Sequence, residues 1–572
     1  MKQIKEKIFE REGFVIFLVV ALSLLSVYQL LLPGFYEPQD LHHLADIYEM
    51  ARALVSGQLP PRWGPDFLYG FGYPLFNFYY PGPFYLGAFV YFLSGNLRLS
   101  YEAVFEISAV VGSVGFYFFL RNHFSKMAAL PASVLFIFTP YKAVEIFVRG
   151  AMGEFLSLAL FPWILFFTEK YIDSRKRKWF VLLGAAAFLT IISHNYFWVL
   201  IFIFCGLYFL LRGCFDKNYH YLKSFVVAAV FSLLASAYWW SPALIEQKLL
   251  ITQTPFPLID HFPFVKQLFL PFWGYGASVW GPNDGMSFQL GVVNVVSVLL
   301  AILVILLLKN KNRQAIYIWS LLSFVLCLFF MNSRSYFIWN LVPFYNLFQF
   351  PWRLLAFAGF FSSLCAALTI EVLRDNKKRL LSSLVFCLII VSSTALTINY
   401  FKPSRIFYKS DTDYLQRMFT SQPFTKNASV SEDYINYSED YLLLPKWVAQ
   451  KPNVTYKGKF ASKDESVKVL DIKKISEVSW QAEVEAADAG KIYFYSLYFP
   501  GWEASVDGHK AQIGYGDLGQ IELNLPKGTK SVHVYWQETD LRKVADVISL
   551  LSLIAMSLYA SGIKFFHRSN NR

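Results

Sequence analysis

Long apolar runs recur along this chain and constrain its fold more than any other feature. They have roughly the length that an α-helix needs to cross the hydrocarbon core of a bilayer, about 20 residues. Charged residues make up only 16% of the sequence, whereas soluble globular chains average about 25%. The sequence therefore predicts a mainly α, polytopic membrane protein. The clearest runs are Phe14–Pro33, Trp179–Ile192, Phe225–Trp240, Leu290–Leu308 and Val544–Ala560.

The net charge of +12 is distributed in a way that indicates which loops face the cytoplasm. Basic clusters at Arg175–Lys178, Lys309–Arg313 and Arg374–Arg379 lie between apolar runs, as cytoplasmic loops do under the positive-inside rule. The charged start Lys2–Glu12 precedes a first run that lacks a small-residue cleavage site, so we expect an uncleaved anchor. This placement argues against a nucleic-acid partner and predicts that both termini are cytoplasmic.

One apolar segment has to stay outside the count of spans if every basic cluster is to be cytoplasmic. Pro83–Leu93 is apolar over only about eleven residues, and we expect an interfacial or re-entrant helix on the outer face. About twelve spans then remain, in a multi-pass protein of the cell (plasma or inner) membrane. They are expected near 14–33, 103–120, 127–141, 152–170, 179–195, 196–212, 224–241, 288–308, 315–331, 352–372, 380–399 and 544–562.

The pattern changes after residue 400. Apolar and polar residues alternate in Val467–Ile472, Val478–Val484, Ile492–Leu497 and Val532–Trp536, and Asp507-Gly508 supplies a turn. This pattern is typical of antiparallel strands. The expected organisation is a transmembrane core over 1–400 with a first outer loop at 34–102. An extracytoplasmic domain follows over 401–541, β-rich from about 460, and a final span at 544–562 leads to a short cytoplasmic tail.

The first outer loop holds the first group of candidate site residues. Glu37, Asp40, His42 and His43 follow within about seven residues of the membrane end of the first span. A carboxylate there can act as a general base. Apolar spacing from Leu41 also fits a surface helix, in which Asp40 would be the N-cap and would have no catalytic role. A metal site formed by Asp40, His42 and His43 is a further possibility, although consecutive histidines point in different directions on a helix.

Further ionisable residues lie at predicted outer ends of spans. They are Arg149, Glu154, His194 and Arg353. Each alone fits a snorkelling or helix-end charge, and Arg149 with Glu154 fits a structural ion pair. Their collection at one level on one face favours a site, because arginines bind phosphate bidentately.

A Gly-, Pro- and aromatic-rich run over 57–74 lies between these two groups. It is too rich in Gly and Pro for a helix and too aromatic for a flexible linker, and it contains Arg62. Such aromatic side chains suit an interface or the faces of sugars. We expect an ordered surface loop with Arg62 as a substrate-binding residue.

An ordered set of short motifs resembles one group of membrane enzymes. The chain is similar to multi-spanning glycosyltransferases of the GT-C superfamily, specifically the YfhO-type and 6-pyruvoyl-tetrahydropterin synthase-related membrane families. The motifs are Asp40-Leu-His42-His43, Gly57-Gln-Leu-Pro-Pro-Arg62-Trp63, Gly70-Phe-Gly-Tyr-Pro74, Phe78-Tyr-Tyr-Pro81, Arg149-Gly-Ala-Met-Gly-Glu154, Ser193-His194-Asn195, Gln349-Phe-Pro-Trp-Arg353 and Phe499-Pro-Gly-Trp502.

This resemblance implies a membrane glycosyltransferase that uses a polyprenyl-phosphate-linked sugar and inverts the anomeric carbon. The acceptor would be a glycan or glycolipid on the outer face. The catalytic carboxylate maps onto Asp40, with Glu37 as helper or, together with Asp40, as ligand of a divalent metal, Mg or Mn. Arg149 and Arg353 would contact the donor phosphate, and His42, His43, Arg62, Glu154 and His194 would line the substrate site.

Two other classes of function fit the residues. One is a transporter or flippase for lipid-linked oligosaccharides, although transporters usually bury ionisable groups near mid-membrane. The other is a non-catalytic envelope scaffold whose β domain binds polymers. Glycan transfer, lipid movement in liposomes, and function after replacement of residues 34–80 would separate the three classes.

Overall fold

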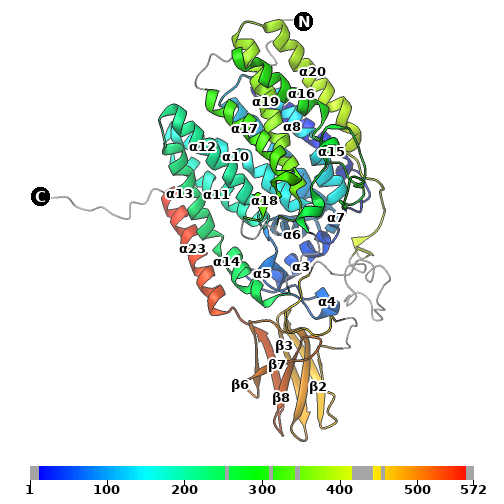
Figure 1. Cartoon of the computed structure of the whole chain (residues 1–572). Helices are drawn as coiled ribbons and strands as arrows, with labels where there is room; N and C mark the ends of the chain where they lie inside the picture. The colour runs from blue at the N-terminus through cyan, green and yellow to red at the C-terminus, as the bar shows by residue number, and fades with distance from the viewer. Residues whose placement is uncertain are drawn as a thin grey trace, which may run out of the picture.

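The structure is a computed structural model, and it describes residues 12–251, 257–307, 313–341, 348–411, 413–414, 442–452 and 458–561. A bundle of helices carries a β domain at one end (Figure 1). The charged start 2–11, most of the basic cluster 309–313, most of the polar stretch 402–459 and the tail after Ser561 lie outside the described residues.

Helices occupy the core region almost continuously. Those outside the last segment are α2 Glu12–Ser26, α3 His43–Val55, α4 Phe67–Gly70, α5 Leu75–Phe78, α6 Gly82–Ser94, α7 Leu97–Arg121, α8 Lys126–Ile137, α9 Pro140–Ala143, α10 Met152–Ser174, α11 Arg177–Ser193, α12 Phe197–Asp216, α13 His220–Ala235, α14 Ala237–Glu246, α15 Val265–Phe269, α16 Val292–Val304, α17 Gln314–Phe330, α18 Tyr336–Trp339, α19 Leu355–Asp375 and α20 Arg379–Thr397. The last helix is α23, Asp540–Ser561.

A helix lies on every predicted span. By length and apolar composition, six helices among the described residues can cross a membrane, or up to nine if each sharply bent pair is one span. Short α2 and α16 are also apolar. The remaining spans are therefore shorter or more bent than a continuous helix of about 20 residues.

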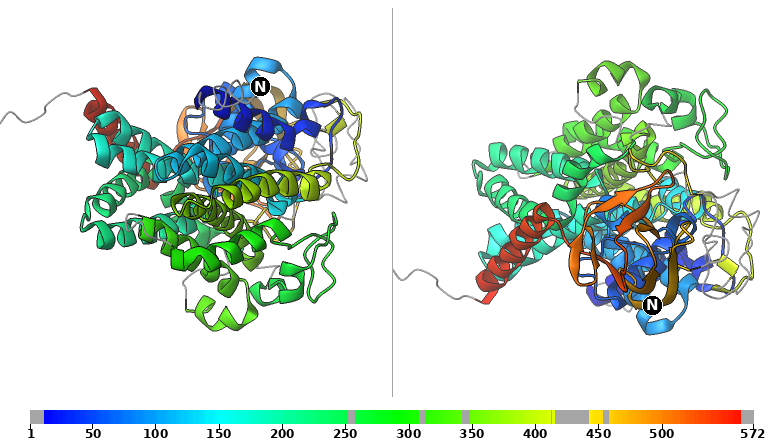
Figure 2. Two further views of the ribbon diagram at one scale, coloured as in Figure 1. Left: turned by 90° about the horizontal axis from the view of Figure 1, so that it is seen from above. Right: turned by 90° about the horizontal axis from the view of Figure 1, so that it is seen from below.

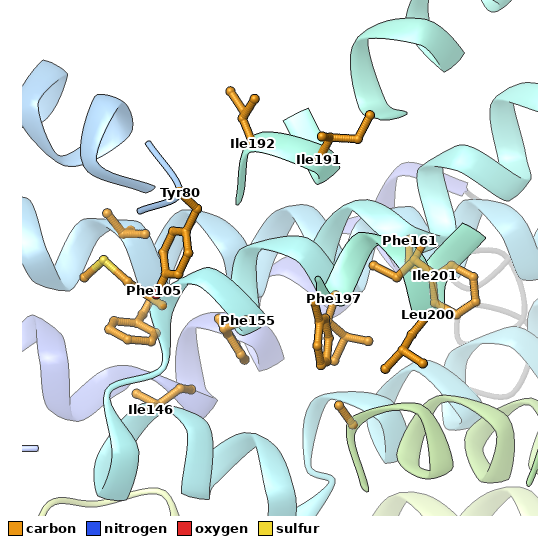
Figure 3. Packing of buried hydrophobic residues seen from close by; sticks show 14 of the residues in the cluster. Tyr80, Phe105, Ile146, Phe155, Phe161, Ile191, Ile192, Phe197, Leu200 and Ile201 are labelled. Carbon is orange, nitrogen blue, oxygen red and sulfur yellow. The ribbon is translucent and has the colours of Figure 1, made fainter. Parts of the chain in front are cut away.

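The span that begins at Pro351 lies at the centre of the bundle. Its most apolar stretch is completely buried, whereas that of α23 is 17% buried. Aromatic side chains fill the space around it, and Phe161 packs on Phe360 with ring centroids 4.4 Å apart. Figure 3 shows this type of packing, with Tyr80, Phe155, Phe161 and Phe197 among the buried residues. The centre of the protein is therefore closely packed, and α23 lies at its edge.

The segment predicted as an outer-face helix forms α6. It has 13 residues, about 20 Å at 1.5 Å per residue, which is shorter than the roughly 30 Å of hydrocarbon. Phe89, Phe92 and Leu93 are all at least half exposed on it. An apolar surface on a short helix is typical of an interfacial position.

The C-terminal domain consists of antiparallel strands in two sheets. The strand orders are β1-β4-β8-β7 and β2-β3-β9-β5-β6. Phe494 of the first sheet packs on Trp502 of the second, with centroids 5.6 Å apart. The strands are β1 Phe460–Ala461, β2 Val467–Ser476, β3 Ser479–Ala486, β4 Gly490–Leu497, β5 Trp502–Val506, β6 His509–Ala511, β7 Ile513–Tyr515, β8 Gln520–Leu525 and β9 Ser531–Trp536. The predicted β-sheet domain is confirmed.

The β domain packs against the first outer loop. Seen from below, the strands lie over the segments near the N-terminus (Figure 2, right). Trp63 contacts Trp502 and Trp536 at centroid distances of 5.3 and 5.1 Å. The backbone N–H of Leu497 donates to the carbonyl of Phe71 at 2.9 Å. The aromatic run 57–74 therefore forms an interface within the chain.

Candidate active site in the first outer loop

Asp40 is fixed beside Arg149 through the backbone. The N–H of Asp40 donates to the carbonyl of Arg149 at 2.8 Å, and the N–H of Gln39 donates to Val148 at 3.0 Å. Helix α3 begins at His43, and no side chain caps its N-terminus. The interpretation of Asp40 as an N-cap is therefore wrong, because His42 occupies that position.

Two glycines in the Arg149–Glu154 motif make these approaches possible. A Cβ on Gly150 would lie 2.5 Å from the Tyr101 hydroxyl and 2.8 Å from Pro38, and the residue has φ +70°. A Cβ on Gly153 would lie 2.6 Å from the Tyr80 ring. Glycine is required where backbones approach this closely or adopt positive φ. The motif therefore brings Arg149 and Glu154 against the first outer loop.

Glu154 is the centre of a buried cluster of charges. Arg149 binds it with two nearly parallel bonds of 2.7 and 2.8 Å, and Arg353 Nε lies 2.9 Å from the same carboxylate. The expected Arg149–Glu154 ion pair is confirmed. Arg149 reaches this position at the end of a widened, π-type helical turn, a feature that is frequent at functional sites.

The second arginine keeps part of its donor capacity away from carboxylates. Its terminal nitrogens contact neutral oxygens, the Phe348 carbonyl at 3.2 Å and Gln349 Oε1 at 3.4 Å. Two guanidinium groups therefore share the Glu154 carboxylate. The negative charge of Asp40 acts on both arginines at longer range. This geometry leaves the cluster suited to an additional anion.

A row of aromatic and imidazole side chains joins this cluster to the start of α3. His194 Nε2 lies 3.9 Å from Glu154, and its ring stacks on Tyr80 at 5.0 Å. The Tyr80 hydroxyl is 3.5 Å from His43 Nε2. The structure thus brings together Asp40, His42, His43, Arg149, Glu154, His194 and Arg353.

His42, His43 and Asp46 form the best candidate for a metal centre among the described residues. Their ligand atoms lie within 4.8 Å of one another, and His43 Nδ1 is 3.1 Å from Asp46. Burial lowers the pKa of His42 to about 3 and that of His43 to about 4. Both imidazoles are therefore neutral at pH 7, the form that ligates metals.

The acidic pair expected to bind a metal is not part of this group. Glu37 lies 3.7 Å from the ammonium of Lys409, and the group contains neither Glu37 nor Asp40. Two imidazoles and one carboxylate suit Zn, Mn or Fe better than Mg. The donors that fit a divalent ion therefore lie on the first turn of α3 and on the residue before it.

Arg62 lies in a separate cluster. It binds Glu538 at 3.3 Å, Asp546 at 2.9 Å and the Tyr238 carbonyl at 2.7 Å. These partners join the first outer loop to α14 and to the start of α23. No ion pair links Arg62 to Glu154 in the described part of the chain.

The sequence interpretation missed Tyr80, Tyr141, Trp352 and Asp46. Tyr141 lies 3.1 Å from Arg149, and the Arg149 guanidinium stacks over Trp352 at 4.7 Å. Asp46 had a detectable signal, because it follows His42 by four residues and His43 by three, which places all three on one helical face.

Comparison with protein families gives one extensive match. A family model described as "6-pyruvoyl-tetrahydropterin synthase related domain; membrane protein" matches residues 76–401, more than half of the chain. The chain belongs to this family. The family region includes Arg149, Glu154, His194 and Arg353 and begins after Asp40. The resemblance to this family that the motifs predicted is confirmed.

Individual relatives are more distant. An uncharacterized protein of Lactococcus lactis subsp. cremoris (strain MG1363) is 24% identical over 195 residues, which cover 33% of this chain. The match spans 32% of that relative's length, about a third.

Similar solved structures include three membrane transferases. Arabinofuranosyltransferase AftD from Mycobacteria has 15% identity over 69% of this chain and 27% of its own, with TM-score 0.47. ArnT from Cupriavidus metallidurans, bound to undecaprenyl phosphate, has 12% identity over 68% and 70%, with TM-score 0.42. Archaeal oligosaccharyltransferase AglB from Archaeoglobus fulgidus has 14% identity over 78% and 61%, with TM-score 0.44. All three scores are below 0.5.

Proposed function

We propose that this protein is a glycosyltransferase that moves a sugar from a polyprenyl-phosphate-linked donor to a glycan or glycolipid acceptor, on the face that carries the β domain. One observation carries the proposal: Asp40 is fixed by its backbone beside two arginines that share a single carboxylate. A base and an anion site are thus adjacent, as displacement of a phosphate leaving group requires.

The arginines bind the donor phosphate. Guanidinium groups match the geometry of phosphate oxygens, and burial strengthens their attraction because water screens little of it. Glu154 orients both side chains, since it accepts the bidentate pair from Arg149 and forms an ion pair with Arg353. His194 and Tyr80 line the side of the site that faces His43.

Asp40 removes the proton of the acceptor hydroxyl. The acceptor oxygen forms a bond to the anomeric carbon while the bond from that carbon to the phosphate oxygen breaks. The phosphate leaves with the electron pair toward Arg149 and Arg353, and the proton moves to Asp40. Attack opposite the leaving group inverts the anomeric centre.

A divalent ion belongs to the same proposal. His42, His43 and Asp46 would hold it, and its charge would help to neutralise the phosphate. Glu37 would act as a helper by position, since its pair with Lys409 ties the loop to the segment after α20. The β domain would hold the loop through Trp63 and Arg62 and would guide the acceptor.

The test uses Asp40→Asn in the full chain reconstituted in liposomes. A panel of undecaprenyl-phosphate-linked monosaccharides is supplied with a membrane glycolipid extract, and release of undecaprenyl phosphate is measured. Loss of a general base lowers the rate about 10²–10⁴-fold. The matched control is Asp488→Asn, since Asp488 is 74% exposed in its pair with Lys527, and it keeps the wild-type rate. Wild-type release by the Asp40 variant would remove this residue from the mechanism.

A further inference from the structure

A cavity lies at the end of α10, whereas the candidate active site is at the start of this helix. It has a volume of about 470 Å³, within the roughly 300–1,000 Å³ that small-molecule sites occupy. It lies where the end of α10 and the starts of α11 and α13 meet the last turns of α23. Since α23 leaves the β domain at Asp540, the cavity is at the opposite end of this helix. Figure 1 shows α13 and α23 side by side there.

The interior of this cavity is apolar. Its polar edge includes the hydroxyls of Tyr171 and Tyr559, which lie 3.5 Å apart. One turn further along α11 from Phe180, a Cβ on Gly184 would overlap the Met556 side chain, so α11 and α23 are in direct contact beside the cavity. The apolar walls are Phe180, Val181, Val227, Phe231, Ala555 and Met556.

Basic side chains line the outer part of the same cavity. Arg175 follows the end of α10, and His220 and Lys223 lie on the first turn of α13. Among the described residues, no carboxylate forms an ion pair with Arg175 or Lys223. Arg177 adds a fourth basic group, since its guanidinium stacks over Tyr559 at 5.6 Å. The cavity therefore combines an apolar interior with a positively charged mouth.

We propose that this cavity binds one anionic phospholipid, with its phosphate headgroup at Arg175 and Lys223 and an acyl chain between α11, α13 and α23. Basic pockets between transmembrane helices recognise such headgroups on the cytoplasmic side, which is the side predicted for the Arg175–Lys178 cluster. The apolar walls favour a lipid over a free phosphate ion, because burying an acyl chain away from water lowers the free energy of binding. The bound lipid would add contacts between α23 and the bundle, at whose edge this helix lies.

The experiment measures lipid bound to the full chain purified in detergent, by native mass spectrometry with added phosphatidylglycerol. Each cation near an anionic headgroup contributes about fivefold in affinity, so Arg175→Gln with Lys223→Gln weakens binding roughly 25-fold. The matched control is Lys176→Gln with Lys178→Gln, which removes the same charge from the Arg175–Lys178 cluster at residues that do not line the cavity. This control retains phosphatidylglycerol as the wild type does.

A second variant keeps every cation and fills the apolar part. Ala555→Trp occupies the volume of the acyl chain and should also lower phosphatidylglycerol binding. Loss of binding in this variant tests the cavity independently of the charge variant, which could lose binding by misfolding. Equal phosphatidylglycerol binding by the double glutamine variant and the wild type would overturn the proposal. Equal binding of phosphatidylcholine would overturn the charge recognition, and equal thermal stabilisation by inorganic phosphate would overturn the assignment to a lipid.

Discussion

Two buried clusters of arginines and carboxylates differ in their balance of charge. In the first, Arg149 and Arg353 share Glu154. In the second, Arg62 and Arg542 face three carboxylates, Glu246, Glu538 and Asp546. The first cluster is suited to receive an anion, whereas the second satisfies its own cations. With the longer-range charge of Asp40 counted, the first cluster is neutral. What separates a candidate binding site from a structural junction is therefore the terminal nitrogens of Arg353, which contact only neutral oxygens.

The two clusters also differ in what they join. The second connects the first outer loop, α14 and α23, and Asn77 enters it through Glu246. The first connects the starts of α10 and of the central span to Asp40. A substitution in the second cluster should lower the stability of the fold, and a substitution in the first should weaken ligand binding.

The largest expected effect is on stability and comes from Arg62→Gln. Removing one partner of a buried ion pair costs about 3–5 kcal/mol. The lower end applies here, because Glu538 and Asp546 are 24% and 26% exposed. Thermal unfolding of the purified protein measures the loss. Lys527→Gln is the control, since Lys527 and its partner Asp488 are 73% and 74% exposed and such a pair is worth about 1 kcal/mol or less. An unchanged melting temperature, with lost polyprenyl-phosphate binding, would instead place Arg62 in the substrate site.

The next effect tests the close approach that fixes Asp40. Gly150→Ala costs about 1–2 kcal/mol from positive φ and also pushes its Cβ into Tyr101 and Pro38. It should lower the transfer rate by displacing Asp40 from Arg149. Gly57→Ala is the matched control, with φ +83° and no atom within 4 Å of the added Cβ. The Gly57→Ala variant should lose a similar amount of stability and keep the wild-type transfer rate. Equal rates in both variants would show that this contact does not align the base.

The smallest effect is expected from Glu37→Gln. Its partner Lys409 is 38% exposed and lies 3.7 Å away, and such pairs contribute about 0–1 kcal/mol. Transfer rate should fall less than tenfold, as a helper role allows. A loss as large as that of Asp40→Asn would make Glu37 the base, and assays of both variants side by side decide between them.

Much of the helical fold follows from local sequence. Apolar runs located the helices, and alternation located β2, β3, β4 and β9, since burial of one face sets each period. Boundaries differed where local capping acts. Helix α7 begins at Leu97, before the expected 103, because the Asn96 side chain accepts from the Leu99 N–H at 2.7 Å.

The site could be predicted only in part. Residue type and membrane level pointed to Arg149, Glu154 and Arg353. The sequence does not show that Arg62 forms its ion pairs in another cluster, because its motif Pro-Arg-Trp resembles the Pro-Trp-Arg motif of Arg353. The N-cap interpretation of Asp40 failed because α3 begins at His43 and His42 takes the N-cap position. Contacts between distant segments, such as Asp40 N–H to Arg149, override local propensity.

The most direct test of the central claim is the affinity of the full chain for undecaprenyl phosphate, measured in detergent with Arg353→Gln. Losing one charged phosphate contact should weaken binding about 10–100-fold. Arg313→Gln is the control, because Arg313 binds Glu371 and Asp375 instead, and its affinity should equal that of the wild type. Undiminished affinity in Arg353→Gln would contradict the assignment of the Arg149–Glu154–Arg353 cluster as the phosphate site.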